Sequence, residues 1–153
     1  MNVLDRFFKK DKIIENPDIF ISYSYKDQEI VERICNVLEL NDFKWAGSSR
    51  NSQNISDSVV NAINHSQLIL FILSNSSNES QNVKNELMFA FSNSKPIIGF
   101  RIDDVIPCTE IEFLMRSSMW IDAYDGYENK MEMLVEDISK LIKNNKILRD
   151  DFF

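Results

Sequence analysis

Hydrophobic residues along the chain alternate between short β-branched runs and longer stretches with helical spacing. The segment from Asp18 to Tyr23 is β-branched and aromatic and follows a proline, which is typical of a first strand. Residues 67–73 are almost continuously apolar, which favours a central strand of a parallel sheet that is covered on both faces. Further strands are predicted at residues 43–46, 95–102 and 119–122.

Helices are predicted between these strands, where apolar residues recur every three or four positions. The first helix runs from Asp27, which is placed to cap it, to Leu40. The third begins near Asn78 and Gln81, which resemble a capping box, and ends near Phe91. The second is marked by Ile55, Val59, Ala62 and Ile63, and the last by Met131, Leu134, Val135, Ile138, Leu141 and Ile142.

This alternation of strands and helices predicts an α/β protein with a flavodoxin-like, doubly wound, parallel five-stranded sheet. We expect one domain at residues 17–145, preceded by an extension at 1–16 and followed by a tail at 146–153. In such folds ligands bind at the carboxyl ends of the strands. The segments of interest are therefore 23–26, 47–54, 74–82 and 103–110, which we expect to be loops or helix starts.

Composition narrows the classes of function. The 153 residues carry a formal net charge of −7, which disfavours a nucleic-acid partner. Two cysteines and one histidine give no basis for a disulfide scaffold, a zinc cluster or a Ser/His/Asp triad. The longest apolar run, Leu68–Leu73, is too short to span a membrane, and the N-terminus lacks the apolar core of a signal peptide. We therefore expect a cytoplasmic protein with no metal and no membrane partner.

Several phosphate-binding and phosphate-accepting motifs are missing. The first strand is not followed by GxGxxG, and no GxxxxGK[ST] motif occurs. A phosphoacceptor receiver domain needs acidic residues after its first and third strands, where this chain has Ser22-Tyr23-Ser24 and Ser74. These absences leave a parallel sheet without a dinucleotide fingerprint, a P-loop or a phosphoacceptor site.

One carboxylate stands out by its position. Val83, Leu87 and Ala90 form the apolar stripe of the third helix, and at 100° per residue Glu86 lies about 80° from the centre of that stripe. It is thus expected at the rim of the buried face, near the carboxyl ends of the strands. A half-buried carboxyl can have a raised pKa and bind hydroxyl groups. The alternative is an ordinary solvated helix glutamate.

The stretch from Asp18 to Asp27, a hydrophobic strand ending in Ser-Tyr-Ser before an acidic helix start, resembles the opening of a Toll/interleukin-1 receptor (TIR) domain. The strand at 67–73 and the sequence Lys84-Asn85-Glu86 are also similar to bacterial TIR domains, as are the later segments Lys95–Ile98 and Trp120–Asp122. The resemblance extends from Pro17 to Lys143 and implies a stand-alone bacterial protein with the TIR fold.

The resemblance also implies an activity. Enzymatic members of this family cleave NAD+ between ribose and nicotinamide, and their catalytic glutamate matches Glu86. NAD+ is then the substrate, and no cofactor is needed. By the same resemblance, substrate binding involves Tyr23, Ser24, Trp45, Arg50 and Asn82. For Trp45 the alternative is core packing, and for Arg50 it is a solvated loop charge.

Two departures from the family pattern bear on product choice. Many bacterial relatives have a Trp-Ile-Ala-Pro-Arg-Asp-like run after the second strand, whereas residues 45–51 here read Trp-Ala-Gly-Ser-Ser-Arg-Asn. Asn82 occupies the position, four residues before the glutamate, where some enzymatic members carry tryptophan. We expect these changes to alter the mobile loop and the nicotinamide platform.

The leading hypothesis is an NAD+-consuming enzyme that makes a linear or cyclic ADP-ribose signal in bacterial anti-phage immunity. This resembles the Thoeris type of defence, in which the product activates a separately encoded effector. Self-association through TIR surfaces is expected to activate it. One alternative is a non-enzymatic TIR adaptor that assembles with other TIR domains. Another is a nucleoside deoxyribosyltransferase-like enzyme, which also uses a single catalytic glutamate.

Overall fold

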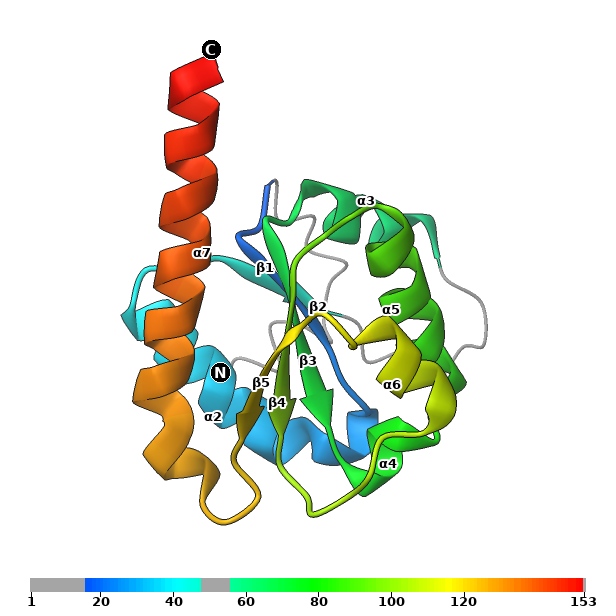
Figure 1. Ribbon diagram of the computed structural model, residues 1–153. Coiled ribbons are helices and arrows are strands. Elements are labelled where there is room, and N and C mark those ends of the chain that lie inside the picture. The colour runs from blue at the N-terminus through cyan, green and yellow to red at the C-terminus, as the bar shows by residue number, and fades with distance from the viewer. Residues whose placement is uncertain (1–15, 48–55, 153) are drawn as a thin grey trace.

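A parallel sheet forms the centre of the protein (Figure 1). The computed structural model describes residues 16–47 and 56–152. Its five strands lie in the order β2-β1-β3-β4-β5, and every neighbouring pair is parallel. This is the flavodoxin-like order, so the predicted fold class is confirmed. The strands are β1 (Ile19–Ser22), β2 (Trp45–Gly47), β3 (Leu68–Leu73), β4 (Ile97–Arg101) and β5 (Met119–Asp122).

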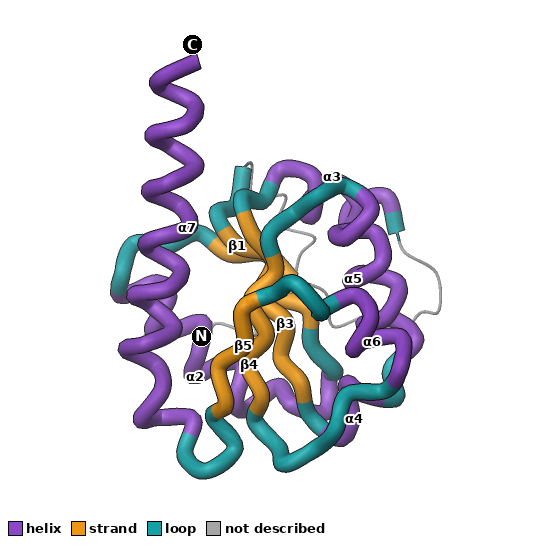
Figure 2. Tube along the Cα trace, in the orientation of Figure 1, coloured by secondary structure: helices purple, strands orange, loops and turns teal. Residues whose placement is uncertain are grey.

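Helices cover both faces of the sheet, as Figure 2 shows. One face is packed by α2 (Gln28–Leu40) and α7 (Met131–Phe152). The opposite face is packed by α3 (Asp57–His65), α5 (Gln81–Ser92) and α6 (Thr109–Leu114). Three short helical segments complete the described chain: η1 (Tyr25–Asp27), α4 (Asn75–Asn78) and η2 (Tyr127–Lys130).

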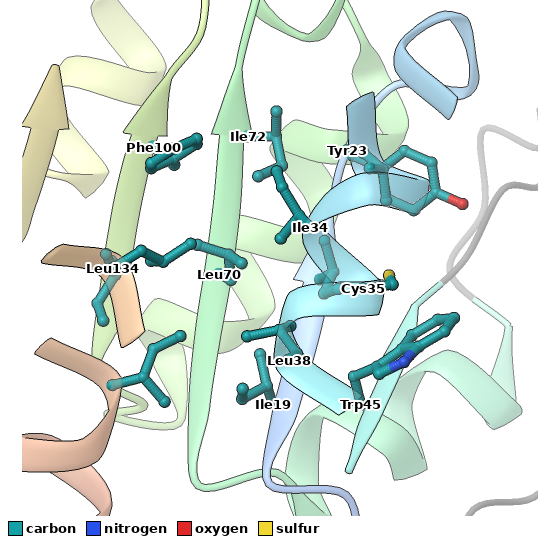
Figure 3. Packing of buried hydrophobic residues seen from close by; sticks show 14 of the residues in the cluster. Ile19, Tyr23, Ile34, Cys35, Leu38, Trp45, Leu70, Ile72, Phe100 and Leu134 are labelled. Carbon is teal, nitrogen blue, oxygen red and sulfur yellow. The ribbon is translucent and has the colours of Figure 1, made fainter. Parts of the chain in front are cut away.

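Strand alternation divides the core into two clusters. Ile19 and Ile21 of β1 lie in the cluster beneath α2, whereas Phe20 lies in the cluster beneath α3 and α5. Figure 3 shows the first cluster, in which Ile34 of α2 and Leu70 of β3 lie close together. All six residues of β3 are buried, which confirms the prediction of a central strand.

Two helices lie where loops were expected. The Ser/Asn segment after β3 contains α4, which is stabilised by a reciprocal capping box between Ser74 and Ser77. It was missed because a four-residue helix of polar residues has no apolar periodicity. The second, α6, follows the loop after β4 and buries Ile111 and Leu114. The other predicted strands and helices are present, with ends shifted by a few residues, and β5 has the predicted bounds.

The caps assigned from sequence were wrong for two helices. Asp27 stands at the start of α2, but its side chain makes no capping hydrogen bond there. The start of α5 is capped by Ser80, which accepts from the backbone N–H of Val83 at 3.3 Å, rather than by a box of Asn78 and Gln81. Asp27 and Asn78 instead form hydrogen bonds with residues distant in the sequence, which are described below.

The last helix, α7, is the longest described helix and extends well beyond the end of the sheet (Figure 1). It continues through residues that were expected to form a tail from position 146. Over residues 16–47 and 56–152, no helix combines the length and apolar character needed to cross a membrane.

Candidate functional site

The candidate site lies at the carboxyl ends of β1 and β3. The helix after β1 packs on one face of the sheet and those after β3 on the other. This reversal makes the point between the two strands a topological switch, where doubly wound folds bind ligands. Ser22 ends β1 beside Phe71 of β3, and Ser74 follows β3 directly. Polar residues therefore replace the apolar core at this edge.

Glu86 reaches this edge from α5. The helix buries Val83, Leu87 and Ala90 against the sheet, and Glu86 lies one turn after Val83 on the same side. Its side chain is only 5% exposed, so it is more deeply buried than the rim position expected from the helical spacing. The carboxylate Oε1 accepts a hydrogen bond from the Ser22 hydroxyl at 2.8 Å. The contact joins residues 64 positions apart in the sequence.

Burial changes the ionisation of this carboxyl group. Desolvation raises the pKa of Glu86 to about 8, and the hydrogen bond from Ser22 acts in the opposite direction. A glutamate with a pKa close to neutrality can exchange between its charged and protonated forms under ordinary conditions. Such perturbed carboxyl groups cluster at functional sites.

Tyr23 follows Ser22 and turns to the opposite face of the sheet, where it joins the cluster beneath α2. Its side chain is 4% exposed, and within the described part of the chain its hydroxyl has no hydrogen-bond partner. Burial raises its pKa, and smaller contributions come from Cys35 and from the charge of Glu86. A buried hydroxyl with no partner among the described residues is a candidate contact for a bound molecule.

A second polar group lies just beyond the strand ends and was not identified from the sequence. The Ser74 hydroxyl donates to Asp27 Oδ2 at 2.5 Å. Burial raises the pKa of Asp27, Ser74 opposes that shift, and the nearby charge of Asp103 adds to it. Asp103 itself accepts from the backbone N–H of Asn75 at 2.8 Å. The starts of α2 and α4 are thus linked to the loop after β4.

Asn78 connects the same edge to α6. Its Oδ1 accepts from the backbone N–H of Cys108 at 2.7 Å, and its Nδ2 donates to the carbonyl of Ile106 at 3.1 Å. These contacts explain why Asn78 does not cap α5. Together with Ser74 and Asp27, they fix the loops around the switch point in place.

The other predicted substrate-binding residues are distributed around this centre. Ser24 is buried, and its hydroxyl caps η1 by accepting from the Lys26 N–H at 3.4 Å. Asn82 lies one turn before Glu86 on α5 and is half-buried. Trp45 begins β2 and packs in the cluster beneath α2, and its indole N–H donates to Glu39 at 3.2 Å. Arg50 lies outside the described residues. The substrate-binding role of all four stays a prediction.

Two acidic residues near the site lie within ion-pair distance of basic side chains. Asp104 lies 3.7 Å from Arg101, and Glu110 lies 3.9 Å from Lys84. Among residues 16–47 and 56–152, no group of three or more His, Cys, Asp or Glu side chains is arranged to hold a metal ion.

Comparison with solved structures shows the same fold in TIR domains. The TIR domain of the Toll-related receptor TRR-2 from Hydra magnipapillata matches with a TM-score of 0.56 and 17% sequence identity, over 80% of this chain and 98% of that one. The TIR domains of the activated Roq1 resistosome, which directly recognises the pathogen effector XopQ, match with a TM-score of 0.53 and 19% identity. That match covers 83% of this chain and 78% of the other.

The sequence was also compared with protein families and with curated proteins. No curated protein matches the chain. The family model for the TIR domain matches residues 19–135, which is most of the chain and includes the switch point and Glu86. The protein therefore belongs to the TIR domain family.

Proposed function

We propose that this TIR protein is an enzyme that cleaves NAD+ between the ribose and nicotinamide, with Glu86 as its catalytic residue. The observation that carries the proposal is the buried Glu86 carboxyl group, hydrogen-bonded to Ser22 at the topological switch point. Structural glutamates are rarely this buried without a basic partner. Membership of the TIR family supports the same assignment, because enzymatic members carry their catalytic glutamate at the matching position.

The proposed chemistry needs one carboxylate. When the bond between ribose C1′ and the nicotinamide nitrogen breaks, its electron pair goes to nicotinamide and neutralises the pyridinium charge. Positive charge then develops on the ribose as an oxocarbenium ion. A nearby negative carboxylate stabilises this charge, and a water-poor site strengthens the interaction. No general acid is required, because nicotinamide leaves as a neutral molecule.

An acceptor then completes the reaction. Water gives ADP-ribose, and its displaced proton can pass to Glu86, whose pKa of about 8 suits proton uptake near neutrality. A nucleophilic atom of the same ADP-ribose gives a cyclic product instead. In the proposed complex the Tyr23 hydroxyl donates to the substrate, since it lacks another partner within the described residues. Ser24 and Asn82 are proposed to line the site beside it.

The finer biological proposal rests on the likeness to bacterial TIR proteins. We infer that the product is a linear or cyclic ADP-ribose signal, as in Thoeris-type anti-phage defence, and that it acts on a separately encoded effector. Self-association of TIR surfaces is proposed to switch the enzyme on. Arg50 is proposed to contact the pyrophosphate of NAD+ through its charge.

The test is direct. Purified protein is incubated with NAD+ at a range of protein concentrations, and nicotinamide and ADP-ribose products are identified by chromatography and mass spectrometry. We expect turnover by the wild type and a loss of at least about 100-fold in Glu86→Gln, the size typical of removing one transition-state electrostatic contact. The exposed Glu79 near the same edge provides the matched control Glu79→Gln, which should keep full activity. Equal turnover by Glu86→Gln, or none by the wild type at any concentration, would overturn the proposal.

An exposed aromatic patch favours a second candidate function, that of an interaction module. Phe91 of α5 and Phe113 of α6 are 47% and 59% exposed, and their ring centroids are 6.1 Å apart. Met88 is also exposed on α5. Grouped exposed apolar side chains mark interaction surfaces. If the protein is an adaptor, Phe113→Ser should abolish association with a TIR partner, whereas Glu86→Gln should leave its biological effect intact.

A deoxyribosyltransferase-like activity can be distinguished from NAD+ cleavage because its substrates are free nucleosides. Incubation with free nucleosides and bases, without NAD+, should produce no base exchange under the leading proposal. Exchange that depends on Glu86, in the absence of NAD+ turnover, would identify that alternative.

A further inference from the structure

Ser22 is the polar residue of β1 that contacts Glu86. It ends β1, which lies between β2 and β3, and its side chain is completely buried. Because strand residues alternate, Ser22 points to the face covered by α5, the same face as Phe20. The backbone ladder with Phe71 fixes the position from which the hydroxyl is presented.

The contact between the two side chains is specific to one oxygen. Ser22 Oγ donates to Oε1 of Glu86 at 2.8 Å, which is a normal distance for a hydroxyl–carboxylate hydrogen bond. Within the described residues, Ser22 is the sole hydrogen-bond donor to this carboxyl group, and Oε2 makes no hydrogen bond. One oxygen is thus held by the protein while the other is left for a bound molecule.

The hydrogen bond from Ser22 and the burial of Glu86 act in opposite directions on the ionisation of the carboxyl group. A hydroxyl that donates to a carboxylate favours its charged form, whereas burial favours the protonated form. For Glu86 these are the two influences, and no cationic side chain of the described residues contributes. The titratable groups on the elements packed against α5 are Tyr23 after β1, the exposed Asp57 and His65 on α3, and Glu110 and Glu112 on α6. On α5 itself, Lys84 lies 3.9 Å from Glu110.

The geometry points to Ser22 as a positioning residue that holds Oε1 of Glu86, favours the charged form of the carboxylate against the effect of burial, and leaves Oε2 directed to substrate. Its effect on turnover rests on the proposed NAD+ chemistry, but its effect on Glu86 does not. Ser22 touches no reacting atom in this scheme and acts through Glu86.

The experiment measures the ionisation of Glu86 itself. The side-chain carboxyl carbon is followed by NMR through a pH titration in protein labelled with carbon-13, and Glu86→Gln identifies the signal. Ser22→Ala removes the hydroxyl donor and should raise the midpoint of the Glu86 titration by about one pH unit, the size expected when a buried carboxylate loses such a donor. Ser22→Thr, which keeps a hydroxyl on a strand residue, should restore most of the shift.

A matched control uses another buried serine. Ser66 lies before β3, and its hydroxyl donates to the carbonyl of Ala62 at 2.6 Å, far along the strand from Glu86. Ser66→Ala should leave the Glu86 titration unchanged. Thermal unfolding of all variants establishes that each is folded before titration. An unchanged midpoint in folded Ser22→Ala would overturn the proposal, whether or not the protein cleaves NAD+.

Turnover provides the second, separate readout. If the protein cleaves NAD+, the acidic limb of its kcat/KM profile should move to higher pH in Ser22→Ala by the same amount as the Glu86 titration. A shifted titration in a protein that never cleaves NAD+ would leave the role of Ser22 intact and reject the proposed function. Activity of Ser22→Ala with an unmoved pH profile would reject the positioning role.

Discussion

The Ser74 hydroxyl donates to the Asp27 carboxylate across 2.5 Å and joins the end of β3 to the start of α2. Forty-seven residues separate these partners in the sequence. The same serine caps α4 by accepting from the backbone N–H of Ser77 at 3.0 Å. One buried hydroxyl thus serves a local helix start and a distant carboxylate at once.

Ser74→Ala should therefore cost more stability than Asp27→Asn. Loss of the hydroxyl removes the cap of α4 as well as the donor to Asp27, and each contact is worth about 1 kcal/mol. Denaturant unfolding of both single variants and of the double variant measures these contributions. The double variant should lose less than the sum of the two single losses, because they share one hydrogen bond. Strictly additive losses would show that the Ser74–Asp27 contact contributes nothing to stability.

Glu86 should make stability depend on pH. The folded-state pKa of about 8 lies above 4.5, the usual value for an exposed glutamate, so between these values the folded protein holds a proton that the unfolded chain releases. The resulting stabilisation is complete at low pH and is lost as pH rises, at up to about 1.4 kcal/mol per pH unit. Unfolding measured from pH 4.5 to 9 should show this decline in the wild type.

The Glu86→Gln variant isolates that effect. It should have a flatter profile over the same range and should exceed the wild type in stability at pH 9, where the buried carboxylate is charged. Glu79→Gln, at an exposed position, should keep the wild-type slope. Parallel profiles for the wild type and Glu86→Gln would contradict the raised pKa.

Tyr23→Phe tests whether the buried hydroxyl serves binding rather than folding. Because the hydroxyl has no partner within the described residues, its removal should leave the free energy of unfolding within about 1 kcal/mol of the wild type. Under the proposed function, KM for NAD+ should rise while folding is unaffected. Tyr25→Phe, with a more exposed ring, is the control. A stability loss of several kcal/mol would show that the hydroxyl is bonded in the folded protein.

Gly99 should be intolerant of a side chain. A Cβ at this position of β4 would overlap ring atoms of Trp120 on the adjacent strand. The half-buried Trp120 ring in turn packs edge-on against Phe71, with centroids 6.1 Å apart. Gly99→Ala should destabilise the protein by about 2 kcal/mol, as overpacking does elsewhere. Thermal unfolding measures the loss, and Gly99→Ala combined with Trp120→Leu should recover part of it. An unchanged midpoint in Gly99→Ala would contradict the close packing.

Much of the fold could be predicted because its signals are local. The apolar run at Leu68–Leu73 specified the central strand, and the spacing of Val83, Leu87 and Ala90 specified the buried face of α5. The short helix α4 was missed because its stability comes from serine and asparagine hydrogen bonds, which leave no hydrophobic pattern. The caps of α2 and α5 were misassigned because a polar side chain near a helix start can also form hydrogen bonds with residues distant in the sequence.

The site was predictable in part. Helical spacing drew attention to Glu86, and the TIR resemblance gave it a role, but neither indicated its depth of burial. Ser22 and Ser74 were considered only as replacements for acidic residues, since a hydroxyl at a strand end gives no sign of its partner. The pairings of Ser22 with Glu86 and of Ser74 with Asp27 depend on which strands become neighbours. That information appears only when the sheet order is known.

The distance in sequence between Ser22 and Glu86 has a consequence for synthesis in the cell. Ser22 leaves the ribosome with β1. Glu86 emerges only after β3, the strand that pairs with β1, has been made. A nascent or truncated chain that ends before α5 contains no assembled site. The contact therefore cannot form before the first three strands, β1, β2 and β3, have been made, and a proteolytic cut between β1 and α5 leaves its two partners on different fragments.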